Sequence, residues 1–118
     1  MTNMRNSVQL IGRPGTDPEV KTFENKRTVV HFNLAVNSSY KNAEQKRVDH
    51  TQWFPIVAWD KLAETIGNLV KKGKQVAIEG SLRNRDWMDN NGVRHLTTEI
   101  LASSFVLIDP VNYSATKG

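Results

Sequence analysis

Three tryptophans occur in this sequence, and basic residues recur around them. Trp53 and Trp59 are six residues apart, an even separation that puts both side chains on one face of a strand. Trp87 alternates with Arg83 and Arg85. An indole stacks on planar aromatic groups, while arginine neutralises anions. These residues therefore predict a surface that holds a flexible polyanion by stacking and by charge.

Two other segments supply further groups of the same kinds. Tyr40 and Lys41 lie in a polar segment, residues 37–49, which has no hydrophobic periodicity and predicts a mobile loop able to close over a bound strand. Lys71 and Lys72 lie where a predicted helix ends, at the border of the same groove. We expect all four residues to belong to the binding surface.

Each of these residues also has an explanation that does not involve binding. Tryptophan is highly buried on average, so an indole is as readily a core residue. Trp53 shares its strand with Phe54 and Ile56, which compete for the inward face. Lysines at the end of a helix stabilise its dipole by about a few tenths of a kcal/mol. The joint occurrence favours binding, because core aromatics need no basic neighbours at alternating positions.

Catalytic and metal chemistries find little support in the sequence. His31, His50 and His95 are widely separated, with no second ligand at the spacing of a metal site, and are expected to be exposed. The glycines form no phosphate-binding motif, and Glu79 and Glu99 are expected to be solvated strand positions rather than a catalytic pair. We expect no catalytic residues, no metal and no cofactor, so the chain is not predicted to be an enzyme.

Composition and charge indicate one globular domain with a basic surface. The 118 residues are 38% hydrophobic and 24% charged, and 16 basic against 12 acidic residues give a net charge of +4. No apolar run approaches the ~20 residues that cross a bilayer. The N-terminus has no secretory signal pattern, and the chain has no cysteine. These features predict an intracellular protein that does not enter a membrane.

The hydrophobic pattern predicts five strands and one helix. Period-two alternation places the strands at residues 7–24 (with a sharp bend near 13–18), 28–36, 50–59, 75–87 and 93–108. Between the third and fourth strands, apolar residues recur at helical spacing, with Asp60 placed to cap the helix and Gly73 to end it. In the last strand, Leu96 and Ile100 are expected in the core.

This succession of elements is that of the OB fold, an all-β, five-stranded barrel with one α-helix between strands 3 and 4. The motif Asp89-Asn90-Asn91-Gly92 predicts a tight hairpin between the last two strands. The prediction makes residues 1–109 one OB-fold domain. Residues 110–118, which follow the last strand, are expected to form a flexible C-terminal tail.

Short motifs spread along the chain add a second line of inference. They are Asn6-Ser7-Val8-Gln9-Leu10-Ile11-Gly12, Asp17-Pro18-Glu19-Val20, Phe32-Asn33-Leu34-Ala35, Thr51-Gln52-Trp53, Lys61-Leu62-Ala63-Glu64, Lys72-Gly73-Lys74-Gln75-Val76, Ile78-Glu79-Gly80-Ser81-Leu82-Arg83 and Thr97-Thr98-Glu99-Ile100. In combination, from about Met4 to Ile108, the sequence resembles bacterial single-stranded DNA-binding proteins. The resemblance implies an OB fold, usually a homotetramer, that binds and protects exposed single strands in replication, recombination and repair.

The resemblance also implies roles for particular residues. Trp53 and Trp87 stand at the base-stacking positions of the family. Tyr40 replaces a loop tryptophan, and Trp59 replaces a phenylalanine. The positions that contact the DNA backbone are occupied by Lys61, Lys71, Lys72, Arg83 and Arg85.

The sequence departs from the family pattern at two places. Phe54 stands where the family often has a histidine that helps to join subunits. The family normally ends in an acidic, hydrophobic tip that recruits repair and replication enzymes, whereas this sequence ends at Gly118 without one. We therefore expect a short form of the family, and we do not expect recruitment through such a tip.

Two related functions stay open beside single-stranded DNA binding. One is an OB-fold assembly protein of the primosome type, which has largely lost the aromatic surface; three tryptophans count against it. The other is a binder of single-stranded RNA, since stacking does not distinguish the sugar. The expected partners are single-stranded DNA and further copies of the chain, and the expected location is the bacterial cytoplasm, with the nucleoid.

Overall fold

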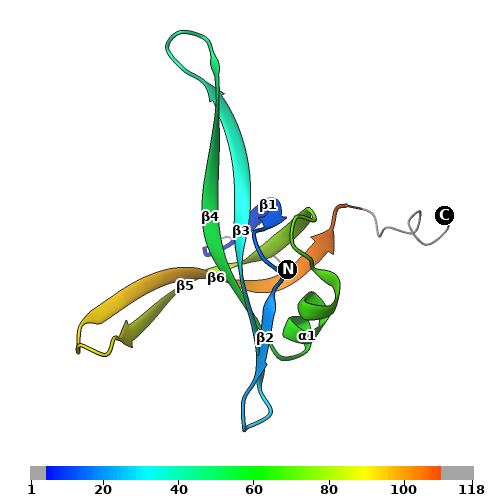
Figure 1. Cartoon of the computed structure of the whole chain (residues 1–118), viewed down its shortest axis with the longest axis vertical. Helices are drawn as coiled ribbons and strands as arrows, with labels where there is room; N and C mark the ends of the chain where they lie inside the picture. Colours follow the sequence, from blue (N-terminus) through cyan, green and yellow to red (C-terminus); the bar gives the residue numbers. More distant parts are fainter. Residues whose placement is uncertain (1–4, 110–118) are drawn as a thin grey trace, which may run out of the picture.

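The computed structural model of the protein describes residues 5–109. Within them the chain forms one helix and six strands (Figure 1). These are β1 (Val8–Pro14), β2 (Glu19–Thr22), β3 (Thr28–Lys41), β4 (Arg47–Trp59), α1 (Asp60–Leu69), β5 (Val76–Met88) and β6 (Arg94–Leu107). The predicted tail, residues 110–118, lies outside the described residues.

The strands form one sheet that closes into a barrel. Their order is β1-β5-β6-β4-β3-β2, and a further antiparallel pairing between β1 and β3, at Arg13 with Ala35, closes it. A short parallel pairing, which includes Ile56 with Ile100, joins β4 to β6. The predicted five-stranded OB barrel with one helix between strands 3 and 4 is confirmed. The sharp bend divides the first predicted strand into β1 and β2, and β2 pairs with β3.

The core is built by alternate residues of the strands and by one face of the helix. Val30, Phe32 and Leu34 of β3 are buried, as their alternation predicts. They form one cluster with Ala63 and Ile66 of α1, which packs against β3. The helix thus closes one side of the barrel and leaves the outer face of β3 and β4 open.

Two glycines allow the strands of the barrel to cross closely. A Cβ built on Gly12 would stand well inside 3.0 Å of the carbonyl oxygen of Ala35, and one on Gly80 would meet the carbonyl of Leu101 in the same way. Gly80 also lies at a register shift between β5 and β6. A side chain at either position would have to displace backbone, which explains why the sequence has glycine there.

Residues 37–49, predicted as a mobile loop, instead extend the hairpin of β3 and β4, so that prediction is wrong. The two strands stay paired as far as Lys41 with Arg47. The turn that joins them is fixed by Asn42, whose Oδ1 accepts two backbone N–H groups, including that of Glu44 at 2.9 Å. The segment is polar on both faces, because neither face meets the core.

Two arms project from the barrel (Figure 1). We call residues 37–51 the β3–β4 arm and residues 83–99 the β5–β6 arm. Leu96, predicted in the core, lies on the β5–β6 arm and is 69% exposed, because beyond the barrel the ribbon has no second layer to pack on. Ile100, at the base of the arm, is buried as predicted.

The ends of the helix differ from the prediction. Asp60 is not a cap: it is the first residue of α1, with a backbone φ of 58°, and its carboxylate pairs with the guanidinium of Arg27 through two contacts of 3.0 Å. Trp59 stands at the cap position without a side-chain cap bond. The helix ends before Val70, and Gly73, with a φ of 79°, belongs to the turn that follows.

Candidate nucleic-acid interface

Trp53 lies on the outer face of β4 and is 57% exposed. Its ring passes over Gly15, in the bend between β1 and β2, where a Cβ would stand 2.7 Å from Cζ3 of the indole. The backbone N–H of Gly15 donates to the carbonyl of Asn33 at 3.0 Å, which fixes the bend beneath the ring. Trp53 is therefore a surface residue whose ring rests on the bend at Gly15, and it is not a core residue.

The bend beneath Trp53 also contacts the segment that carries two predicted site lysines. The backbone N–H of Lys72 donates to Oδ1 of Asp17 at 2.8 Å, and the next backbone N–H donates to the carbonyl of Pro14 at 3.0 Å. Lys71 and Lys72 are exposed on the turn after α1. The segment 14–17 thus joins the indole to a cationic turn on one side of the barrel.

Trp59, at the other end of β4, is half-buried in an aromatic and cationic cluster. Its ring lies 6.3 Å from that of Phe23, and the guanidinium of Arg27 lies 4.8 Å from the indole centroid. Hydrogen bonding to Arg27 lowers the pKa of the Asp60 carboxyl. Lys61 is exposed on the first turn of α1. Sequence reasoning missed Phe23 and Arg27, because the turn between β2 and β3 gives no sign that it packs beside β4.

A shallow hollow lies along the outer face of β3 and of β4, the strand that bears both of these tryptophans. It has a volume of about 210 Å³, and its lining includes His31, Asn33 and Pro55. His31 and Asn33 are exposed on β3, and Asn33 pairs with Pro55 on β4. Pro55 lies just before the pairing of β4 with β6 begins, which agrees with the edge position expected of a strand proline.

Trp87 lies on the β5–β6 arm and is 39% exposed. The ring of His95 stacks on its indole, with centroids 4.5 Å apart and planes at 20°, and the indole N–H donates to Oγ1 of Thr97 at 2.9 Å. Nε2 of His95 lies 2.8 Å from Oδ2 of Asp89, and this contact is the main cause of the lowered pKa of that carboxyl. His95 was expected to be a lone exposed residue, and it is instead part of the Trp87 site.

Arg83 and Arg85 are next to Trp87 in the alternation of β5, but both are paired. Glu99 of β6 accepts a hydrogen bond from Nε of Arg85 at 3.1 Å, and its second oxygen lies 3.8 Å from Arg83. The expectation that Glu99 is solvated is wrong, since it is 4% exposed. Glu79 differs: it is half-buried and accepts a hydrogen bond from Gln9 at 3.0 Å.

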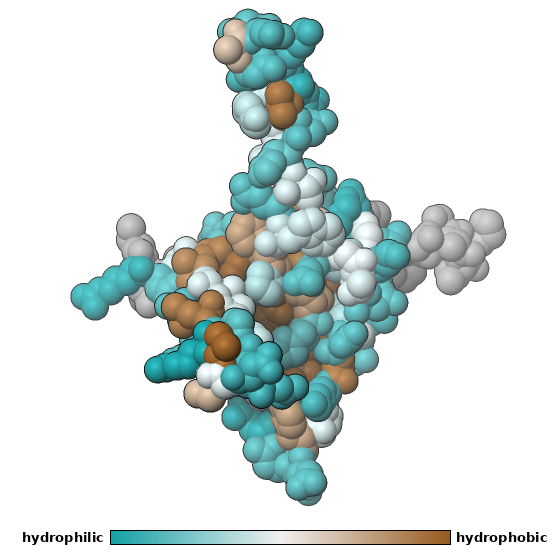
Figure 2. Space-filling view, turned by 60° about the vertical axis from the view of Figure 1, so that its left-hand side comes forward, coloured by the Kyte–Doolittle hydropathy of each residue, from teal (hydrophilic) through white to brown (hydrophobic). Residues whose placement is uncertain are grey.

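Tyr40 and Lys41 lie near the tip of the β3–β4 arm, opposite Val48 and Arg47. Tyr40 is exposed. Figure 2 shows the arm as a mostly hydrophilic projection from the barrel. Because the arm is a hairpin and not a loop, these residues extend away from the barrel instead of folding over it.

The described part of the chain offers aromatic surfaces with cations beside them. Arg27 lies over the ring of Trp59, and the guanidinium of Arg85 lies 5.8 Å from the ring centroid of Trp87. Trp53 is linked through the segment 14–17 to the turn that carries Lys71 and Lys72. Among residues 5–109, no three histidine or acidic side chains are placed to hold a metal ion. Nor is any helix in that range long and apolar enough to cross a membrane.

Comparison with known proteins places the chain beside proteins that bind single strands. The model of the Single-strand binding protein family matches residues 5–108. Single-stranded DNA-binding protein 1 of Chlorobaculum tepidum is 39% identical over 104 residues, which are 87% of this chain and 64% of the relative. The single-stranded DNA-binding protein of Caldanaerobacter subterraneus subsp. tengcongensis is 41% identical over 107 residues, 91% of this chain and 70% of the relative.

A solved structure agrees with the fold at similar coverage. The Plasmodium falciparum SSB in complex with ssDNA superposes with a TM-score of 0.78 at 30% identity, over 88% of this chain and 95% of that one. The barrel described above is thus similar to one that has been observed with a single strand bound.

Proposed function

Because the chain belongs to the single-strand binding protein family, we propose that it binds single-stranded DNA without sequence preference and protects exposed strands during replication, recombination and repair. The observation that supports this most directly is the indole of Trp53, which is 57% exposed although tryptophan is usually buried. It stands above a bend that also contacts a cationic turn. The names of the relatives and the bound strand of the structural neighbour support the same function.

Such a surface can bind a strand without reading its bases. Every base has an aromatic face, and stacking on a protein aromatic contributes about 1–3 kcal/mol per base. Cations between the aromatics neutralise phosphates and release counterions. We assign stacking to Tyr40, Trp53, Trp59 and Trp87, and phosphate contacts to Lys41, Lys61, Lys71, Lys72, Arg83 and Arg85.

The proposal describes a binding protein and not an enzyme, in line with a family of DNA-binding proteins. We propose residues 1–109 as the binding domain and residues 110–118 as a separate C-terminal tail. The protein would act in the bacterial cytoplasm, at the nucleoid, wherever a strand is left unpaired.

Titration with oligothymidine, followed by intrinsic tryptophan fluorescence, tests this function. We expect strong quenching that saturates, weakens with salt and persists in the presence of duplex DNA. Oligouridine as a competitor separates DNA binding from RNA binding: stronger competition by oligouridine than by unlabelled oligothymidine would favour an RNA binder. Absence of quenching would favour the assembly protein, because its exposed tryptophans would then face another subunit.

Lys72→Ala is expected to make binding less sensitive to salt. Each phosphate neutralised on a single strand contributes about −0.7 to the slope of log affinity against log salt, so the slope should become shallower by up to about that amount. Affinities for oligothymidine at several salt concentrations measure it. Lys72→Arg, which keeps the charge, is the control and should keep the slope. A slope that does not change in Lys72→Ala would remove this lysine from the binding surface.

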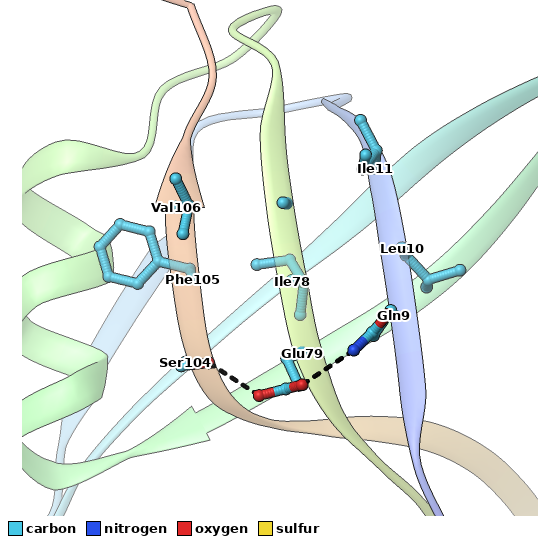
Figure 3. Close-up of a pocket in the computed structure, with 9 residues that line it drawn as sticks. Gln9, Leu10, Ile11, Ile78, Glu79, Ser104, Phe105 and Val106 are labelled. Carbon is cyan, nitrogen blue, oxygen red and sulfur yellow. Dashed lines mark hydrogen bonds between the residues drawn. The ribbon is translucent and has the colours of Figure 1, made fainter. Parts of the chain in front are cut away.

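We also propose that the protein acts as a homo-oligomer, by its resemblance a homotetramer, joined through the outer face of β1, β5 and β6. Ile11, Ala77 and Val106 are paired in register across these strands and form an apolar row. Ile11 is 55% exposed and Val106 is 64% exposed. A hollow of about 430 Å³ lies on this face (Figure 3).

In Val8–Gly12, β1 pairs with β5 along one side, and the described residues place no strand on the other. A second β1 can therefore extend the sheet.

The double variant Ile11→Glu, Val106→Glu is expected to dissociate this assembly, since it buries charge in the proposed interface. Size-exclusion chromatography with light scattering should show the mass falling from a multiple of 13.4 kDa to that of one chain. Val93→Glu, at an exposed apolar position on the β5–β6 hairpin turn, is the control and should keep the wild-type mass. A wild-type protein that elutes as a monomer would contradict the proposal.

A further inference from the structure

Glu99 is a buried carboxylate within the proposed DNA-binding surface. It lies on β6 opposite Arg83 of β5 and is 4% exposed, whereas the side chains of Arg83 and Arg85 are 38% and 47% exposed. A carboxylate is expensive to bury unless its oxygens are paired. Its presence beneath two proposed phosphate ligands therefore calls for an explanation.

The two oxygens of Glu99 are in different situations. Oε1 accepts a hydrogen bond from Nε of Arg85 at 3.1 Å. Because Nε and not the terminal nitrogens makes this contact, the terminal NH2 groups of Arg85 stay available to a phosphate. Oε2 is buried without a hydrogen-bond partner, and a terminal nitrogen of Arg83 lies 3.8 Å from it.

Arg83 thus has two possible anionic partners, the carboxylate of Glu99 and a phosphate of a bound strand. Inside the protein it can move toward the unpartnered Oε2, and outside it can reach a phosphate of a bound strand. The interaction with a buried carboxylate is screened by salt less than one between exposed groups. Two arginines and one carboxylate also carry a net charge of +1, so the site offers a bound strand less positive charge than its two arginines suggest.

We propose that Glu99 is a positioning residue of the DNA-binding surface: it fixes Arg85 through Nε and competes with a DNA phosphate for Arg83. The inference rests on the proposed function, because it assumes that both arginines meet the bound strand. It predicts that this site neutralises fewer phosphates than the two arginines alone would.

Glu99→Gln tests the competition, because glutamine keeps an oxygen for Arg85 and removes the charge that attracts Arg83. We expect tighter binding of oligothymidine at low salt and a slope of log affinity against log salt that is steeper by up to about 0.7. Between roughly 50 and 200 mM salt, that difference amounts to about a threefold larger loss of affinity than in the wild type. Equal slopes in the two proteins would overturn the proposal.

Glu79→Gln is the matched control, since it removes one negative charge from the neighbouring part of the same strand pair. Glu79 contacts Gln9 and Ser104 rather than an arginine (Figure 3). Its slope should equal that of the wild type. A steeper slope in Glu79→Gln as well would show that overall charge is responsible and would also overturn the proposal.

Arg83→Gln tests the same idea with Glu99 intact, so it does not depend on how well Glu99→Gln folds. If Glu99 and a DNA phosphate share Arg83, the Arg83→Gln variant should have a shallower slope of log affinity against log salt than the wild type. The change should be clearly smaller than the ~0.7 of a fully neutralised phosphate, but larger than zero. A full loss would show that Glu99 does not compete, and no loss would show that Arg83 lies outside the surface. If the wild type itself bound no oligothymidine, the proposed function would fail; if Arg85→Ala lowered the slope while Glu99→Gln left it unchanged, only this inference would fail.

Discussion

Trp53→Ala is expected to weaken the binding of single-stranded DNA by about 1–3 kcal/mol, the value of one base stacked on an aromatic side chain. The fold should stay intact, because the indole is 57% exposed and rests on Gly15 rather than in the core. Affinity for oligothymidine, measured by anisotropy of a labelled strand, gives the first quantity, and thermal unfolding gives the second.

Trp53→Phe serves as the control for this prediction, since a smaller ring still stacks and should restore much of the affinity. The opposite pattern, in which Trp53→Ala keeps its affinity but loses much of its melting temperature, would identify the indole as a structural residue. The bend under the ring would then be a packing contact only.

Gly12→Ala is expected to destabilise the barrel by about 3 kcal/mol, at the upper end of what overpacking usually costs. The added Cβ would have to displace the carbonyl of Ala35, on the strand whose pairing with β1 closes the barrel. For a domain of this size, such a loss lowers the melting temperature by roughly 10 °C or more. Chemical unfolding measures the loss in free energy of unfolding, and thermal unfolding measures the change in melting temperature.

Gly15→Ala is the matched control, three residues further along the same segment. Its Cβ would meet the six-membered ring of Trp53, an exposed side chain that can move aside. Stability should therefore change little, while DNA affinity falls because the indole is displaced. If Gly12→Ala unfolded at the wild-type temperature, the crossing of β1 and β3 would not be as close as described.

The order of the elements and much of the core could be predicted from the sequence, because each barrel strand has one buried face. In β3, Val30, Phe32 and Leu34 recur at a period of two for that reason. The exposure of Trp87 was also predictable, since it alternates with Arg83 and Arg85 on a charged face of its strand. These features depend on local pattern alone.

The arms could not be predicted in this way. Residues 37–49 pair as strands without a core on either face, so they show no alternation. Leu96 was misassigned for the related reason that an apolar residue on an arm has nothing to pack against. Pattern analysis detects burial, and it misses strands that are not buried.

Sequence reasoning missed which residues face each other across the β5–β6 arm, although the hairpin turn predicts these pairs. The turn from Asp89 to Gly92 fixes the register of the hairpin, and counting back from it pairs Trp87 with His95. Continuing the count pairs Arg83 with Glu99. That Glu99 is buried, however, depends on how the neighbouring side chains lie over it, which the sequence does not specify.

The polar character of the β3–β4 arm has a consequence for solubility. A two-stranded ribbon that leaves the barrel has free N–H and C=O groups along both sides, and such groups can recruit strands from other molecules into aggregates. Charged side chains blunt this tendency, and the arm has several near its tip, including Lys41, Arg47 and Asp49. The same composition that made the segment resemble a loop thus allows a long ribbon to stand alone in water.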